Sequence, residues 1–137
     1  MAYSEDTAGS MITTDFIEIS SHQTVGEALE TVKKSAHEIE AIYYVYVHDD
    51  EGKLTGVLSW RHLMTTDPAL QLGNIAQPRL VTLSLKADMN EIADTFLRYN
   101  FLYLPVVDES GVLVGVISFK HAFDQLLPHL YRVWKQD

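Results

Sequence analysis

Thr55-Gly56-Val57-Leu58-Ser59-Trp60-Arg61-His62-Leu63 has a near-copy later in this chain, Val114-Gly115-Val116-Ile117-Ser118-Phe119-Lys120-His121-Ala122. In both copies an apolar run ends in a serine, which is followed by an aromatic residue, a cation and a histidine. We interpret each copy as a buried strand that leads into a short helix. Because an internal repeat decides the architecture of a whole chain, we expect two copies of one small module.

The residues around each copy predict the same order of elements in both halves of the chain. In the first half we expect strands at 16–20, 41–48 and 54–59, a helix after Thr24 and a short helix at 60–66. In the second half we expect strands at 80–84, 102–107 and 112–118, a helix after Asp88 and a closing helix at 119–127. Pro128 has no N–H to donate, and we expect it to break or kink the closing helix.

The register of the two halves supports a duplication. Both long helices begin with a capping box, Thr24 with Glu27 and Asp88 with Glu91, 64 residues apart. The repeated stretches are 59 residues apart, so the first half holds five extra residues, upstream of Tyr44. Each half alone is too small to bury both faces of its sheet. We therefore predict an α/β fold in which two intertwined strand-helix-strand-strand-helix repeats pack sheet to sheet with pseudo-twofold symmetry.

The composition is that of an acidic chain without cysteine. Its 137 residues include 10 basic and 19 acidic ones, for a formal net charge of −9. This charge argues against nucleic-acid binding, which depends on Lys and Arg at phosphates. The absence of cysteine excludes disulfides, thiolate nucleophiles and thiolate metal sites. No apolar run approaches the roughly 20 residues of a membrane span, and no signal-peptide pattern is present, so we expect a cytoplasmic protein without direct membrane insertion.

The two motifs and their surroundings resemble a tandem cystathionine-β-synthase-type (CBS) domain pair. The hallmark of that family is Gly-h-h-Ser/Thr-x-x-Asp-h, where h is apolar, and Gly56–Leu63 and Gly115–Ala122 follow it except at the aspartate. Leu104-Pro105-Val106-Val107-Asp108 is similar to the family's preceding strand. The resemblance implies a lead-in segment at 1–14, repeats at 15–66 and 80–127, a connection at 67–79 and a tail at 128–137.

Three stretches are similar to one branch of this family, the MgtE-type magnesium transporters. They are Tyr3-Ser4-Glu5-Asp6-Thr7-Ala8-Gly9-Ser10-Met11-Ile12, Ile42-Tyr43-Tyr44-Val45-Tyr46-Val47 and Gly56-Val57-Leu58-Ser59-Trp60-Arg61. This resemblance implies a regulatory region at the cytoplasmic face of the membrane, linked to a transporter domain outside this chain. The end of the closing helix departs from the pattern of that branch.

Within the family, adenine nucleotides (ATP, ADP or AMP) bind between the two repeats. Carried over by position, the resemblance implies a set of nucleotide-binding candidates: Tyr44, Tyr46, Ser59, Arg61, His62, Thr82, Pro105, Ser118, Lys120 and His121. Hydroxyl groups and cations suit phosphate, because a charged donor strengthens the hydrogen bond. No cofactor is expected to be required.

Both copies depart from the family at the residue expected to bind ribose. His62 and His121 replace the motif's aspartate, and a neutral imidazole offers one donor and one acceptor instead of a carboxylate. One reading is a weakened, different or absent ligand, or a pocket that responds to pH. The other reading is that both histidines only cap or pack at the start of a helix.

Magnesium is the second candidate ligand, because it prefers oxygen donors and keeps several waters. The resemblance points to acids on surfaces that face other transporter domains, with these contributors: Asp88, Glu91, Asp94, Asp108 and Asp124. For each acid alone, a solvated surface position is the simpler interpretation. The six histidines lack metal-site spacing, and the chain has no nucleophile elbow, Walker loop or Rossmann fingerprint, so we expect no catalysis.

The closing helix and tail carry a set of large apolar residues: Phe119, Phe123, Leu126, Leu130, Tyr131 and Trp134. An exposed apolar surface of this kind favours a homodimer. The sequence thus predicts a non-catalytic regulatory module that senses a small ligand and controls a linked magnesium or divalent-cation transporter. Two alternatives stay open: a dimerisation module with degenerate ligand sites, and a regulatory CBS pair of another protein, such as a pyrophosphatase or a dehydrogenase.

Overall fold

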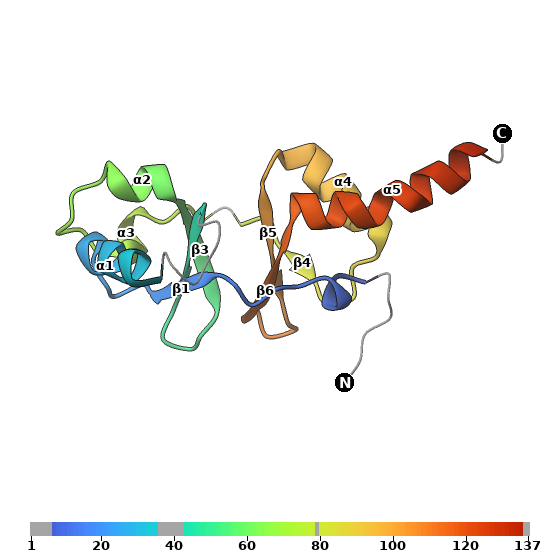
Figure 1. The fold of residues 1–137 in the computed structure, drawn as a ribbon. Coiled ribbons are helices and arrows are strands. Elements are labelled where there is room, and N and C mark those ends of the chain that lie inside the picture. Colours follow the sequence, from blue (N-terminus) through green and yellow to red (C-terminus); the bar gives the residue numbers. More distant parts are fainter. Residues whose placement is uncertain (1–6, 36–42, 79, 136–137) are drawn as a thin grey trace.

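Each half of the chain folds into a three-stranded sheet with helices on its outer face, and the inner faces of the two sheets pack together (Figure 1). The computed structural model describes residues 7–35, 43–78 and 80–135. The core between the sheets contains Tyr46, Leu54, Leu113 and Val116. This arrangement confirms the predicted α/β fold of two repeats packed sheet to sheet.

The first repeat forms the sheet β1-β2-β3. Strand β1 (Ile17–Ser20) is parallel to β2 (Tyr44–His48), which is antiparallel to β3 (Leu54–Ser59). Helices α1 (Val25–Ser35) and α2 (Trp60–Met64) pack on the outer face through apolar residues such as Val32 and Leu63. Some expected parts lie outside the described residues. They are residue 36 of the helix expected after Thr24, residues 41 and 42 of the expected strand 41–48, and the first four residues of the Tyr3–Ile12 stretch.

The second repeat forms the sheet β4-β5-β6 with the same directions. Its elements are β4 (Leu83–Ser84), α4 (Met89–Tyr99), β5 (Tyr103–Val107), β6 (Leu113–Ser118) and α5 (Phe119–Lys135). The lead-in contains the 3-10 helix η1 (Ala8–Ser10), which adds Ala8 to this core. The connection also contains an unexpected short helix, α3 (Leu72–Ile75), which buries Leu72 against the first repeat.

The predicted capping box at Thr24 and Glu27 forms with both of its hydrogen bonds, and Asp88 forms the predicted N-cap of the second long helix. The backbone N–H of Glu27 donates to Thr24 Oγ1 at 3.2 Å, and the N–H of Thr24 donates to Glu27 Oε1 at 2.9 Å. In the second repeat the N–H of Glu91 donates to Asp88 Oδ1 at 2.9 Å. These bonds satisfy first-turn donors that have no partner within the helix.

The expected break at Pro128 is wrong, because α5 continues through it to Lys135. Proline removes one backbone hydrogen bond from a helix interior, and the hydrogen bonds of neighbouring turns sustain the helix here. Most of the predicted tail is therefore part of α5. The side chains of Leu130, Tyr131 and Trp134 lie outside the described part of the chain.

The segment before each repeat pairs with the sheet of the other repeat. Thr13 exchanges two backbone hydrogen bonds with Val116 of β6, at 2.9 and 3.0 Å. Gln77, which precedes the second repeat, exchanges two with Val57 of β3, at 3.1 and 3.4 Å. Figure 1 shows the blue lead-in crossing from the second sheet to β1. This exchange makes the repeats intertwined.

The glycine of each motif makes this crossing possible. A Cβ on Gly56 would lie 2.5 Å from Ala76 Cβ, and one on Gly115 would lie 2.7 Å from Ile12 Cβ. Both Cβ–Cβ distances are shorter than real side chains allow. The crossing segments, residues 12–13 and 76–77, can therefore approach these strands only where the strand has a glycine. The motif glycines therefore have a packing role that is independent of any ligand.

We expect Gly56→Ala to lower the free energy of unfolding by about 1–3 kcal/mol, because the added methyl forces the 76–77 segment away from β3. Urea unfolding followed by circular dichroism measures this loss.

Gly26→Ala, in helix α1, is the matched control. A Cβ at Gly26 would lie 3.4–3.5 Å from atoms of Pro68, which is an ordinary van der Waals distance. Its stability should stay unchanged or rise, since alanine favours a helix by up to about 1 kcal/mol over glycine. The double variant Gly56→Ala/Ala76→Gly removes the clashing methyl and should recover part of the loss. Equal unfolding midpoints for Gly56→Ala and the wild type would contradict this account.

Candidate functional site

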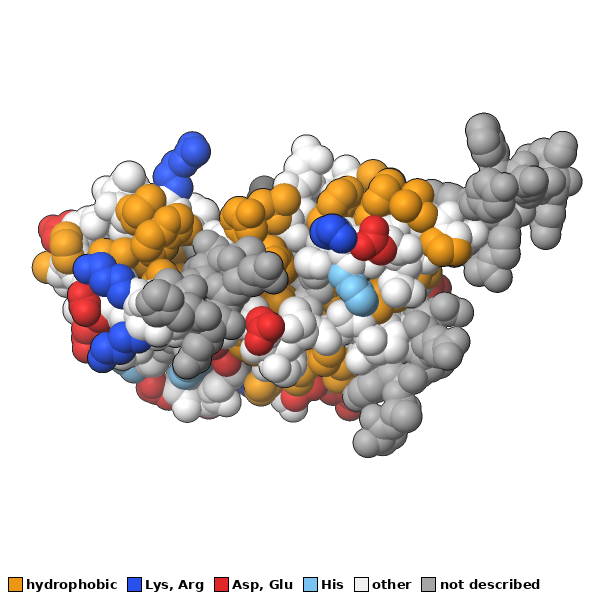
Figure 2. Space-filling model, viewed as in Figure 1, with side chains coloured by type: hydrophobic (Ala, Val, Ile, Leu, Met, Phe, Trp, Pro, Cys, Tyr) orange, Lys and Arg blue, Asp and Glu red, His pale blue; other side chains and the backbone are white. Residues whose placement is uncertain are grey.

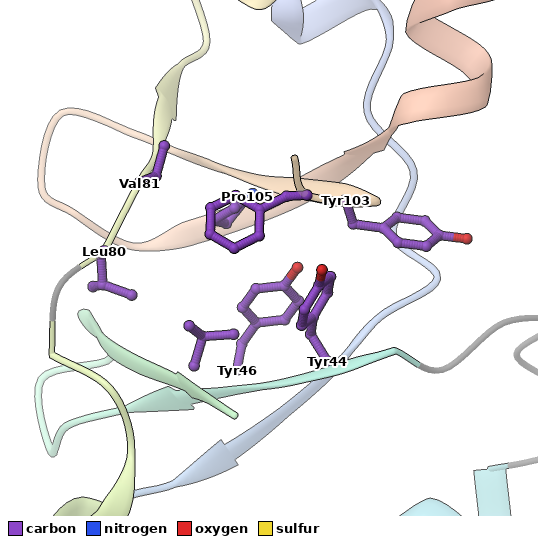
Figure 3. A pocket seen from close by; sticks show the side chains of 8 residues that line it. Tyr44, Tyr46, Leu80, Val81, Tyr103 and Pro105 are labelled. Atoms are coloured by element: carbon purple, nitrogen blue, oxygen red, sulfur yellow. The ribbon is translucent and has the colours of Figure 1, made fainter. Parts of the chain in front are cut away.

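A small, partly open cavity of about 30 Å³ lies between the two repeats (Figure 3). Ligand pockets in proteins span about 300–1,000 Å³, so the walls have to separate to admit a ligand larger than water. Both sheets contribute its walls, which are Tyr44, Tyr46, Val57, Leu80, Val81, Phe101, Tyr103 and Pro105. The walls carry aromatic and aliphatic groups with tyrosine hydroxyls and no charged side chain.

Strand alternation aims these residues into the cavity. In β2, Val45 and Val47 point to the helix side, so Tyr44 and Tyr46 point to the other sheet. The Tyr44 ring lies 6.1 Å from the Phe101 ring in an edge-to-face arrangement, and the Tyr44 hydroxyl accepts from the N–H of Leu102 at 3.4 Å. Tyr44 therefore joins the two repeats at the side of the cavity.

Pro105 explains why the expected strand 80–84 shortens to Leu83–Ser84. Strand β4 pairs with Val106 and Val107 of β5, and Pro105, one residue earlier, has no N–H with which to extend the ladder. In the first repeat Tyr46 stands at that position and pairs with Glu18. The unpaired stretch before β4 contributes Leu80 and Val81 to the cavity wall.

The serines of the two motifs act as helix caps. Ser59 Oγ accepts from the backbone N–H of His62 at 3.1 Å, and Ser118 Oγ accepts from that of His121 at 3.0 Å. Ser59 is also the cross-strand partner of Tyr44, which places this helix start beside the cavity. Within the described residues, neither imidazole has a hydrogen-bond partner, so the caps are formed by the serines and not by the histidine rings.

Seven of the ten nucleotide-binding candidates lie outside the cavity walls, whereas Tyr44, Tyr46 and Pro105 line it. The seven are Ser59, Arg61, His62, Thr82, Ser118, Lys120 and His121. Arg61 and Thr82 are exposed, and Lys120 pairs with Asp124 at 3.0 Å on the surface of α5. The structure thus brings the wall residues together and leaves the polar motif residues at the strand–helix junctions.

The five candidate magnesium ligands do not converge. Asp88 and Glu91 belong to the cap of α4, Asp94 pairs with Arg98 at 2.9 Å, and Asp124 pairs with Lys120. Asp108 accepts from the N–H groups of Ser110 and Val112 in the β5–β6 turn. Among the side chains described, at residues 7–35, 43–78 and 80–128, no three His, Cys, Asp or Glu residues form a group that could hold a metal ion.

Sequence reasoning missed five wall residues: Val57, Leu80, Val81, Phe101 and Tyr103. The repeat offset offered a signal for one of them, because Tyr103 occupies in β5 the position that Tyr44 occupies in β2. Leu80 and Val81 had no such signal, because their exposure to the cavity depends on the missing N–H of Pro105.

Two ionisable groups at the inner face of the first sheet are affected by burial. Burial raises the pKa of the Glu18 carboxyl, and the nearby His48 partly offsets this. Burial also raises the pKa of the Tyr46 hydroxyl, with Tyr44 and Tyr103 adding to the effect. Tyr46 therefore remains a neutral hydroxyl, whereas ionisation of Glu18 is disfavoured by the fold.

Comparisons with known proteins match the family model described as "CBS domain" at residues 8–68 and 72–127. The chain is 39 % identical over 124 residues to the magnesium transporter MgtE of Thermus thermophilus, covering 90 % of this chain and 28 % of that protein. It is also similar to the crystal structure of the cytosolic domain of the Mg²⁺ channel MgtE in complex with ATP. There the TM-score is 0.86 at 39 % identity, over 90 % of this chain and 50 % of that one.

A second solved structure, the soluble part of a magnesium transporter, has a TM-score of 0.88 at 35 % identity. The match covers 93 % of this chain and 50 % of that one. The chain thus spans less than a third of the full transporter that it matches and half of each soluble structure. None of the helices in the described part of the chain is long and apolar enough to cross a membrane.

We expect Glu18→Gln to raise thermal stability near neutral pH. The raised pKa means that the folded state holds the Glu18 proton more tightly than the unfolded state. The ionised carboxylate therefore costs stability at neutral pH, and this cost disappears as the pH falls below 4.5, the ordinary value. Melting temperatures of both proteins across this range test the sign.

Glu109→Gln is the control, because Glu109 is an exposed acid whose contact with Lys86 spans 4.0 Å. Exposed pairs of this kind contribute about 0–1 kcal/mol, so this variant should show little pH-dependent difference from the wild type. A gain for Glu18→Gln that persists unchanged at acidic pH would refute the assignment.

Proposed function

This chain belongs to the CBS-domain family, and from that premise we propose that it is a non-catalytic regulatory module that binds an adenine nucleotide between its repeats. The observation that carries the proposal is the cavity walled by residues of both repeats. A ligand held there contacts both sheets at once. Its binding favours whichever arrangement of the repeats fits it better.

The chemistry of the cavity suits a nucleobase. Aromatic rings stack on bases without sequence preference, and three tyrosines and Phe101 are available here. The relative of known structure with 39 % identity is described in complex with ATP. That description supports an adenine nucleotide as the ligand to test first.

Phosphate would be held at the start of α2, next to the cavity. Arg61 follows the Ser59 cap and has an exposed guanidinium, which forms charge-assisted hydrogen bonds with phosphate oxygens. His62 replaces the family's aspartate at this junction, so the ribose lacks its carboxylate clamp. We therefore propose that the base and the phosphates supply most of the affinity.

We propose further that the module controls a linked magnesium transporter from the cytoplasmic side. The support is its 39 % identity to a magnesium transporter more than three times its length. Magnesium requires only one or two carboxylates together with waters. The acids of α4, the β5–β6 turn and α5 would then bind it jointly with other domains of the longer protein.

A second candidate function is homodimerisation, favoured by an apolar groove between α4 and α5. Figure 2 shows hydrophobic side chains gathered over these helices. The groove is lined by Met89, Ile92, Ala93, Phe96, Leu97, Phe119, Ala122, Phe123 and Leu126. Leu97 is 74 % exposed and Phe123 is 43 % exposed, so a second copy would bury substantial apolar area here. If the nucleotide site is degenerate, this would be the module's main role.

Isothermal titration of the chain with ATP, ADP and AMP tests the nucleotide proposal. We expect binding of all three, and we expect Phe101→Ala to weaken it at least about fivefold, since one base–aromatic contact contributes about 1–3 kcal/mol. Arg61→Ala should weaken ATP more than AMP, because ATP carries more phosphate charge.

Phe123→Ala is the matched control for Phe101→Ala, because it removes the same side chain from the α4–α5 groove. It should leave nucleotide affinity unchanged. Absence of binding heat with all three nucleotides at millimolar concentration would rule out the nucleotide proposal and favour the dimerisation module.

Sedimentation velocity at micromolar concentration tests the second candidate. We expect a dimer for the wild type and a monomer for Phe123→Asp, because a buried carboxylate opposes association across an apolar groove. Leu70→Asp places the same charge on an exposed leucine of the connection and should remain dimeric. A monomeric wild type would exclude this interface.

A further inference from the structure

The cavity contains one buried polar atom without a partner, the hydroxyl of Tyr46. Tyr46 is only 3 % exposed, and its Oη forms no hydrogen bond in the described structure. Figure 3 shows the Tyr46 hydroxyl directed from β2 toward the space below Pro105 and β5. A buried hydroxyl without a partner costs free energy, so native structures rarely keep one without a reason.

The neighbouring tyrosine shows that this is not a general property of the cavity. Tyr44 stands two residues earlier on the same strand, and its hydroxyl accepts a hydrogen bond from Leu102 across the interface. The Tyr46 ring is held between apolar contacts, with the Phe16 ring edge-on at 6.2 Å and the Tyr44 ring at 6.4 Å. Packing therefore fixes the ring and leaves its hydroxyl facing the cavity.

We propose that Tyr46 Oη is a specificity-determining group that hydrogen-bonds to the edge of the nucleobase in this cavity, an inference that rests on the proposed nucleotide function. Apart from the tyrosine hydroxyls, the wall residues present apolar side chains to a bound ligand. A purine edge carries ring nitrogens and exocyclic groups that require partners when water is excluded. Tyr46 offers one donor and one acceptor for them.

The contribution of this hydrogen bond is independent of pH in the neutral range. Burial raises the pKa of the Tyr46 hydroxyl, so it stays protonated and able to donate. Any pH dependence of nucleotide affinity would then arise at groups other than Tyr46.

Tyr46→Phe removes only the hydroxyl and is the direct test. We expect the affinities for ATP and for AMP to fall by the same factor, about 2- to 10-fold, because both ligands share the base edge and a hydrogen bond contributes about 0.5–1.5 kcal/mol. We expect the melting temperature of the ligand-free variant to equal or exceed that of the wild type, because the unpaired buried hydroxyl is gone.

Tyr99→Phe is the control, because it removes a hydroxyl from an exposed tyrosine of α4 that does not line the cavity. This control should change neither the nucleotide affinities nor the melting temperature.

If the wild type binds nucleotide and Tyr46→Phe binds it equally well, the inference is overturned while the nucleotide function stands, and the hydroxyl is satisfied by water only. If Tyr46→Phe loses more affinity for ATP than for AMP, the inference is also overturned, because such a difference indicates a contact with the phosphates and not with the base. If the wild type binds no nucleotide, the proposed function and this inference fail together.

Discussion

The close approach of a crossing segment to each sheet is the constraint on which the rest of the structure depends. The segments around Ile12 and Ala76 pass over Gly115 and Gly56, and each pairs there with the sheet of the opposite repeat. A side chain at either glycine would push the segment away and leave the edge strand β6 or β3 unpaired. The inner faces of the sheets are then positioned to meet, which creates both the central core and the cavity at its side.

The parts of the fold that could be predicted are those with local signals. Thr24 and Asp88 form their expected N-cap hydrogen bonds, and five of the six strands lie close to their expected positions. The sixth, β4, is cut to two residues by Pro105 on a neighbouring strand, an effect that a reading of residues 80–84 alone does not reveal. The crossing pairs at Thr13 and Gln77 join distant segments, and no local pattern encodes them.

The candidate site likewise combines features that have local sequence signals with features that depend on distant segments. Of the residues that family resemblance proposed for nucleotide binding, Tyr44, Tyr46 and Pro105 line the cavity because strand register directs them there, and Thr82 does not. It did not reveal that the motif serines cap helices, or that the walls contain no charged side chain. Whether a strand residue reaches a cavity depends on the opposite sheet, so Phe101 and its neighbours became visible only in three dimensions. The polar motif residues and the apolar cavity are two adjacent regions, joined where Ser59 pairs with Tyr44.

The crossing of the lead-in segment also orders events during synthesis. Within this module the segment around Thr13 is synthesised well before its partner Val116, which belongs to the last strand of the second repeat. Until β6 is made, the backbone groups of the early segment have no strand to pair with. Contacts this far apart in sequence make closure slow relative to local helix formation. The nascent module therefore carries an unpaired lead-in segment until β6 has been synthesised, which is the interval in which chaperone protection would matter most.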